Sequence, residues 1–181
     1  MNLEIICAGF GGQGILTAGL IMIHAGHKLG KRITWYPSYG SEMRGGTANC
    51  NVRISDEAIG NPYCAELDIL LAMNGPSVAR FAPMLKPQGL LLYNSDAVGE
   101  PPALGQDISL AAVDAARLAA EAENPKGQNI VMLGALARKV EFFGGGLLRE
   151  TVCDFFESRG KGQFNDKNKT AFDLGFSAAA I

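Results

Sequence analysis

A cluster of glycines between an apolar run and an apolar helix constrains this chain more than any other feature. Residues 3–19 read LEIICAGFGGQGILTAG, and the cluster consists of Gly9, Gly11, Gly12, Gln13 and Gly14. A buried strand that ends in such a cluster and leads directly into a helix is typical of an α/β domain with a Rossmann-like start. The loop amides and the first helical turn favour an anionic group. The alternative is a tight turn in which the glycines serve packing alone.

The spacing Gly9-x-Gly11-Gly12-x-Gly14 contains the dinucleotide-binding fingerprint, but the rest of that site is missing. A nicotinamide or flavin site needs an acid at the end of the second strand, where this chain reads Trp35-Tyr36-Pro37-Ser38. The run LKPQGLLLY (85–93) is similar to a turn of S-adenosylmethionine methyltransferases, which need the same acid. A free-standing dinucleotide-binding module and a small methyltransferase therefore stay as alternatives.

Apolar strands and helices alternate along the chain. The pattern predicts strands at 3–8, 33–36, 47–54, 67–73, 90–93 and 107–110, and helices at 13–29, 76–82, 112–122, 130–140, 147–156 and from 171 onward. This order predicts one domain over residues 1–181, an α/β fold with three layers (α/β/α) and a mostly parallel sheet. An antiparallel strand at 47–54 would make the sheet mixed.

That strand shows a clean alternation of side chains. Ala48, Cys50, Val52 and Ile54 share one face, and the other face carries Asn49, Asn51 and Arg53. We expect the polar face to be solvated, with a subunit interface as the alternative.

Composition excludes several classes of function. The net charge of −2 over 181 residues attracts neither nucleic acid nor an anionic membrane. The start of the sequence has no basic signal-peptide region, and the longest apolar stretch, 15–25, is too short to span a bilayer, so we expect a cytoplasmic protein. The four cysteines, Cys7, Cys50, Cys64 and Cys153, have no metal-ligand spacing, so no metal site is expected.

Several long motifs together resemble one family. They are GFGGQG (9–14), WYPSYGSEMRGGTANC (35–50), NPYCAELDILLAMNGPS (61–77), LKPQGLLLYNS (85–95) and ENPKGQNIVMLGALAR (123–138). This chain resembles the gamma subunit, or gamma domain, of the 2-oxoacid:ferredoxin oxidoreductases from residue 3 to about residue 175. The RGGTANC segment is more similar to the enzymes for 2-oxoglutarate or branched-chain 2-oxoacids than to those for pyruvate.

The resemblance implies a role within a complex. The family decarboxylates a 2-oxoacid on thiamine diphosphate with magnesium, transfers the acyl group to coenzyme A, and passes electrons through [4Fe-4S] clusters to an external ferredoxin. This chain lacks the GDG and NN segments of thiamine-binding subunits and the cluster cysteines. The implied partners are alpha and beta (thiamine-binding) subunits and a ferredoxin-like subunit, with no cofactor bound by this chain alone and no catalytic residue in it.

The candidate site residues follow from these motifs. We expect Gly9, Gly11, Gly12, Gln13 and Gly14 to offer donors to a diphosphate, the coenzyme A tail or a partner's carboxylate. Arginine suits a carboxylate or phosphate, so the loop around Glu42 and Arg44 is expected to face the neighbouring subunit. Its other members are Ser38, Tyr39, Gly40, Gly45 and Gly46, and Asn74 lies where ligand crevices of α/β sheets form. The alternative for Glu42 and Arg44 is an ion pair within the loop.

Overall fold

A computed structural model describes residues 1–39, 47–105 and 107–179. The six strands of the sheet are β1 (Asn2–Phe10), β2 (Arg32–Tyr39), β3 (Thr47–Ser55), β4 (Leu67–Ala72), β5 (Leu85–Asn94) and β6 (Ser109–Val113), in the order β2-β3-β1-β4-β5-β6. β3 is antiparallel to both β1 and β2, whereas β1, β4, β5 and β6 run parallel to one another. The expected α/β fold with a mixed sheet is confirmed.

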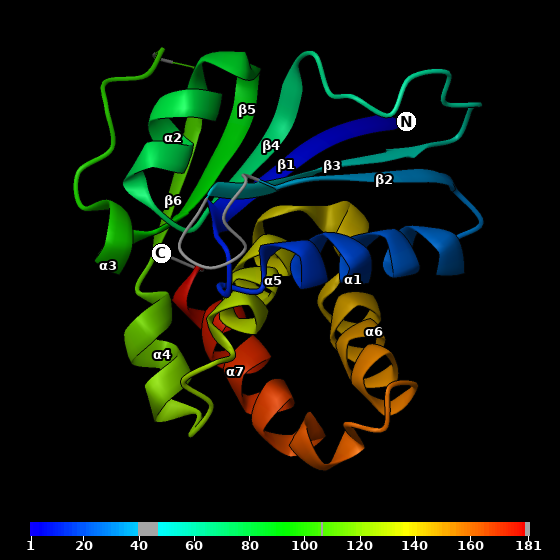
Figure 1. Cartoon of the computed structure of the whole chain (residues 1–181), viewed down its shortest axis with the longest axis vertical. Helices are drawn as coiled ribbons and strands as arrows, with labels where there is room; N and C mark the ends of the chain where they lie inside the picture. Colours follow the sequence, from blue (N-terminus) through cyan, green and yellow to red (C-terminus); the bar gives the residue numbers. More distant parts are fainter. Residues whose placement is uncertain (40–46, 106, 180–181) are drawn as a thin grey trace.

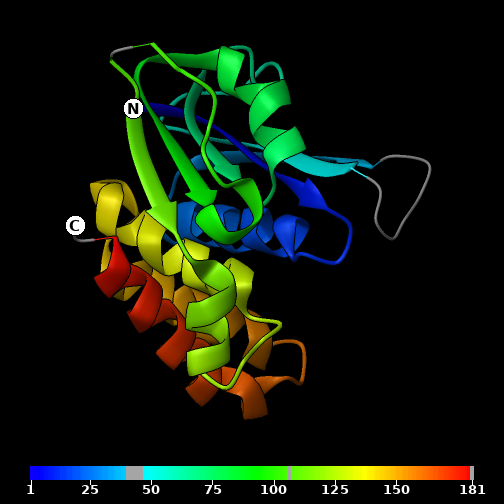
Figure 2. The same ribbon diagram turned by 90° about the vertical axis from the view of Figure 1, so that its left-hand side faces the viewer.

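Helices cover both faces of this sheet, but unequally (Figure 1). One face carries α1 (Ile15–Lys28), α4 (Ala115–Glu121), α5 (Gln128–Lys139), α6 (Gly145–Glu157) and α7 (Asn165–Ala178). The other face carries α2 (Gly75–Phe81), the 3-10 turn after it, the short α3 (Ser95–Val98), the segment 56–66 and part of the connection between α3 and β6. Figure 2, turned by 90°, shows the large helical layer projecting away from the sheet. Short 3-10 turns lie at Ala82–Met84, Glu141–Phe143 and Gly162–Phe164.

β1 is the central strand because its side chains are apolar on both faces. Ile5 and Cys7 belong to the core under the large helical layer, and Ile6 and Ala8 belong to the smaller core under α2. All four are at most 2% exposed. A strand that is buried on both faces has a continuous run of apolar residues, and this run is the pattern that predicted β1 from the sequence.

α5 is the most buried helix, and two glycines bring it close to α7. A Cβ on Gly134 would lie 2.0 Å from the carbonyl oxygen of Phe172, and one on Gly175 would lie 1.9 Å from that of Val131. The two helices therefore touch through their backbones, which fixes the position of the α5 N-terminus relative to the sheet.

Several element boundaries differ from the prediction, for local reasons. The strand expected at 90–93 begins at Leu85 instead, so the KPQG segment lies inside β5, where the pairing with β4 shifts register between Leu67 and Ile69. The strand expected at 107–110 is β6, which continues to Val113, and helix α4 then begins at Ala115 with Asp114 as its N-cap. The helix expected from residue 171 begins at Asn165 instead.

Candidate anion-binding site at the glycine loop

The glycine loop lies at the edge of the sheet where strand ends of several elements meet. β1 and β4 are parallel neighbours, so Phe10 and Ala72 end at the same edge. β3 begins there as well, because it is antiparallel to β1 and Thr47 pairs with Phe10. β2 also ends there, since Tyr39 pairs with Ala48. Ligand crevices of α/β sheets form at such edges.

Gln13 holds the loop against the end of β4. Its Oε1 accepts hydrogen bonds from the backbone N–H of Phe10 at 2.7 Å and from Nδ2 of Asn74 at 3.4 Å, and its Nε2 donates to the carbonyl of Met73 at 3.3 Å. Asn74 in turn caps α2, because its Oδ1 accepts from the N–H of Ser77 at 2.9 Å. The structure thus brings Gln13 and Asn74 together, and both side chains are engaged in fixing the loop.

Gly14 needs to be glycine for two reasons. Its φ of +72° lies in the left-handed region, and a Cβ there would approach Nδ2 of Asn129 to 2.6 Å. Asn129, at the start of α5, donates from that same Nδ2 to the carbonyl of Gly14 at 3.1 Å. Close packing also explains why residue 9 is a glycine, because a Cβ there would lie 2.6 Å from Oε1 of Gln13.

A cavity of about 280 Å³ opens above the loop. Its wall includes Gly11, Gly12 and Gly14 together with the first turn of α1. Within the described part of the chain, the N–H groups of Ile15 and Leu16 have no acceptor. The first turn of α1 also carries no acidic side chain, so the partial positive charge of the helix N-terminus is left uncompensated.

The second candidate loop begins and ends at the same cavity. Tyr39 and Thr47, which flank residues 40–46, both line it. Ser38 lies in β2 opposite Asn49 and is exposed, and Tyr39 is 59% exposed. Gly40, Glu42, Arg44, Gly45 and Gly46 lie outside the described residues. The two sequence motifs therefore converge at one place.

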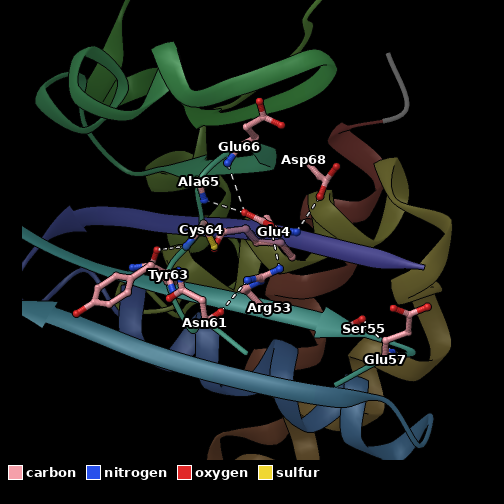
Figure 3. A network of polar contacts seen from close by, with 12 residues as sticks. Glu4, Arg53, Ser55, Glu57, Asn61, Tyr63, Cys64, Ala65, Glu66 and Asp68 are labelled. Carbon is pink, nitrogen blue, oxygen red and sulfur yellow. Dashed lines mark hydrogen bonds and ion pairs between the residues drawn. The ribbon is translucent and has the colours of Figure 1, made fainter. Parts of the chain in front are cut away.

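The polar face of β3 is not solvated, so that expectation is wrong. Asn49 and Asn51 are buried, at 8% and 7% exposure, and the Arg53 side chain is 15% exposed. The segment 56–66, which lacks regular structure, covers this face (Figure 3). Oδ1 of Asn51 accepts from the N–H of Cys64 at 3.0 Å.

An ion pair anchors the same covering segment. Arg53 Nη2 lies 3.0 Å from Oε1 of Glu4 on β1, and its Nη1 donates to the carbonyl of Asn61 at 2.7 Å. The other carboxylate oxygen of Glu4 accepts from the N–H of Ala65 at 2.8 Å (Figure 3). This network belongs to the fold and lies away from the glycine cavity.

The cysteines are buried thiols. Cys7 and Cys50 face each other across β1 and β3, and the neighbouring Cys50 thiol, together with burial, raises the pKa of Cys7. Burial also raises the pKa of Cys64 to about 12. Among the described residues no group of histidine, cysteine or acidic side chains is placed to hold a metal ion. In that same part of the chain, no helix is both long and apolar enough to cross a membrane.

Sequence reasoning missed three residues of the site. Asn129 supports Gly14 from 115 positions away, and Thr17 and Thr47 bring hydroxyl groups to the cavity wall. No local sequence pattern pointed to Asn129, because its partner is a backbone carbonyl in a distant part of the chain.

The family model for pyruvate ferredoxin/flavodoxin oxidoreductase matches residues 4–178. The chain belongs to this oxidoreductase family. Among curated relatives, the 2-oxoglutarate synthase subunit KorC of Methanocaldococcus jannaschii is 34% identical over 99% of this chain and 95% of its own length. The ketoisovalerate oxidoreductase subunit VorA of Methanothermobacter thermautotrophicus is 39% identical over 75% of this chain, but the match spans only 28% of that relative.

Solved structures of the same oxidoreductase family share the fold. The gamma subunit of a keto/oxoacid ferredoxin oxidoreductase from Geobacter sulfurreducens superposes with a TM-score of 0.82 at 31% identity, over 98% of both chains. A 2-oxoglutarate:ferredoxin oxidoreductase from Magnetococcus marinus, with 2-oxoglutarate, coenzyme A and succinyl-CoA bound, gives 0.86 at 26% identity and covers 98% of this chain and 31% of that one. The predicted family is confirmed, and the match to a gamma subunit extends over nearly the whole chain.

Proposed function

We propose that this chain, as one gamma domain over residues 1–181, is the gamma subunit of a cytoplasmic 2-oxoacid:ferredoxin oxidoreductase. The complex would convert 2-oxoglutarate or a branched-chain 2-oxoacid to acyl-CoA, CO2 and reduced ferredoxin. Near full-length similarity to a KorC subunit and to a solved gamma subunit supports this assignment. The relatives named for 2-oxoglutarate and for ketoisovalerate support the choice of substrate class.

The glycine cavity is the observation that carries the assignment to a supporting subunit. It offers backbone N–H groups and hydroxyl groups, and its described lining has no histidine, cysteine or carboxylate. Such a lining suits binding and orienting an anion, and among its described residues it holds none of the histidine, cysteine or carboxylate groups that most often transfer protons or attack carbonyls. We therefore assign binding to this chain and the chemical steps to the partner subunits, so the isolated chain is expected to be inactive.

The cofactors of the complex fit this chain unequally. Its described residues do not suit an iron–sulfur cluster, because three of the four thiols are buried and no metal-binding group is formed among these residues. They do not suit the magnesium of thiamine diphosphate either, since the cavity wall lacks carboxylates. A phosphate of coenzyme A fits the amides at the start of α1, and Gly11, Gly12 and Gly14 are the residues that would hold it.

The exposed residues around the cavity support docking of a partner there. Tyr39 is 59% exposed and Phe10 is 36% exposed, and both line the cavity mouth. Aromatic side chains of this kind are enriched at protein interfaces. We place the alpha and beta subunits on this edge of the sheet, with the loop of Glu42 and Arg44 between them and the cavity, and a ferredoxin-like subunit elsewhere in the complex.

Co-expression of this chain with its candidate partner subunits tests the proposal. The purified complex is assayed with 2-oxoglutarate, 2-oxoisovalerate and pyruvate, in the presence of coenzyme A and ferredoxin. We expect activity with one of the first two acids and none from this chain alone. Activity with neither, in a complex that assembles fully and contains its cofactors, would contradict the proposed substrate class.

Arg44→Ala tests the role of the second loop in the same complex. It is expected to leave this chain folded while lowering either assembly or turnover, whereas Arg117→Ala on the exposed face of α4 should change neither. Normal assembly and normal turnover of the Arg44→Ala complex would contradict an interface role for that loop.

A further inference from the structure

A second cavity, of about 370 Å³, lies within the helical layer beside the N-terminus of α5. It is bounded by the start of α5, the end of α6, the 3-10 turn at 162–164 and the start of α7. It is separate from the glycine cavity and shares no lining residue with it.

The N-terminus of α5 opens onto this second cavity. Gly127 is the N-cap and offers no side chain, and the first turn has no acidic residue. Its carbonyl accepts from the N–H groups of Ile130 and Val131, but those of Gln128 and Asn129 have no acceptor among the described residues. Two N–H donors and the positive end of a 12-residue helix thus face the same place.

A buried side chain in the wall of the cavity also lacks a hydrogen-bond acceptor. Asn168 is only 3% exposed, and its Oδ1 accepts from Nδ2 of Asn124 at 2.9 Å. Its own Nδ2 is buried and has no partner among the described residues. A buried donor without an acceptor is unfavourable, so a ligand oxygen within hydrogen-bond distance of this amide would satisfy it.

Two lysines add positive charge at the rim. Lys126 and Lys161 both line the cavity, are exposed, and form no ion pair with any described carboxylate. By contrast Lys167, which lies nearby on α7, is paired with Glu123 at 3.3 Å. The cavity therefore combines free cationic groups, helix amides and an amide donor, all of which suit a phosphate group.

The opposite wall is aromatic. Phe164 is 48% exposed although it lines the cavity, and Phe156 and Ile130 continue this apolar surface. A flat ring can pack against such a wall while a phosphate lies at the α5 N-terminus.

We propose that this cavity binds a phosphate ester that carries a flat aromatic group, as a nucleotide does. The phosphate is held by Lys126, Lys161 and the N–H groups at the start of α5, and the ring packs on Phe164. A free nucleotide and the nucleotide end of coenzyme A share this chemistry. The site stands on its own contacts and does not depend on the function proposed above.

Titration of the whole chain with AMP, coenzyme A, adenosine and inorganic phosphate, followed by calorimetry, tests the proposal. We expect AMP or coenzyme A to bind more tightly than adenosine or phosphate alone, and the tighter of the two identifies the source of the nucleotide. The double variant Lys126→Gln/Lys161→Gln should weaken that binding by at least about tenfold, because charge-assisted hydrogen bonds are lost. Phe164→Leu should weaken the binding of AMP more than the binding of phosphate.

One matched control locates the binding. Lys139→Gln removes an exposed lysine at the other end of α5 and should not change the affinity. Bound nucleotide should also protect Lys126 and Lys161 from acetylation in the unaltered chain, which tests the site without any variant. The proposal is overturned if none of the nucleotides binds, if the double lysine variant binds normally, or if Lys139→Gln weakens binding as much as the double lysine variant does.

Discussion

Asn129 donates a hydrogen bond to the carbonyl of Gly14 across 115 positions of sequence, and the 3.1 Å contact joins the N-terminus of α5 to the glycine loop. The same side chain occupies the space that a Cβ on Gly14 would need. The conformation of the loop therefore depends both on its own glycines and on a helix of the large layer. A substitution in either one should change the packing of the other.

Gly14→Ala is expected to destabilise the chain by about 2–3 kcal/mol. About 1 kcal/mol comes from a positive φ, and the remainder comes from the collision with Asn129. Gly160→Ala is the matched control, because Gly160 has a φ of +67° and nothing within 4 Å of a Cβ. Gly160→Ala should lower the free energy of unfolding only by the contribution of the positive φ. Urea unfolding measures both.

The double variant Gly14→Ala/Asn129→Ala separates the collision from the backbone strain. Removing the Asn129 side chain makes room for the methyl group, so the double variant should cost less than the sum of the two single variants. If the losses in the free energy of unfolding of the two single variants add up to that of the double variant, the two residues do not interact in the way that the geometry indicates.

Gln13→Ala should lower the free energy of unfolding by about 1–2 kcal/mol, because the backbone N–H of Phe10 and the carbonyl of Met73 lose their partner. Gln163→Ala, at an exposed position without side-chain hydrogen bonds among the described residues, should change stability by less than about 0.5 kcal/mol. Equal changes in the free energy of unfolding for the two variants would contradict the anchoring role of Gln13.

Glu4→Gln is expected to cost about 3 kcal/mol, because it leaves the largely buried guanidinium of Arg53 without its counter-charge. The variant should also increase proteolytic cleavage within 56–66, whose backbone Glu4 helps to hold. Lys167→Gln breaks an exposed pair and should cost less than about 1 kcal/mol. Urea unfolding and limited proteolysis provide the two readouts, and unchanged cleavage in Glu4→Gln would contradict the anchoring.

The thiols should react slowly and in a fixed order. With a pKa of about 12, roughly one Cys64 thiol in 10,000 is a thiolate at pH 8, and the fraction rises about tenfold for each unit of pH. Cys153, which is half-buried, should be labelled first by iodoacetamide, well before Cys7, Cys50 and Cys64. All four should react rapidly in urea. Native labelling of Cys64 at the rate of Cys153 would contradict this order.

The sequence predicted the fold well wherever a local pattern carries the information. The apolar run of β1 and the helix that follows the glycines were both found. Asn74, expected after a strand end, lies at the end of β4, where its Nδ2 donates to Oε1 of Gln13. Local alternation also showed that Asn49, Asn51 and Arg53 share a face. It could not show what covers that face, because the segment 56–66 has no periodicity of its own and its role depends on contacts with Glu4 and Asn51.

The same limit explains the later errors. The first turn of α7 is polar, and Asn165, Asp166 and Lys167 give no apolar repeat that would signal a helix. Asn129 was overlooked as a site residue because its partner is a backbone carbonyl in a distant part of the sequence, and a contact of that kind leaves no trace in spacing.

The central place of β1 sets a condition on how the chain is made. Its two neighbours in the sheet are β3 and β4, so β1 has no strand to pair with until β3 has been synthesised, and it lacks its second neighbour until residues up to 72 have followed. Synthesis proceeds at about 5–20 residues per second, which leaves β1 unpaired for several seconds. Nascent chains should therefore be most prone to chaperone capture in that interval and should lose this tendency once β4 has emerged.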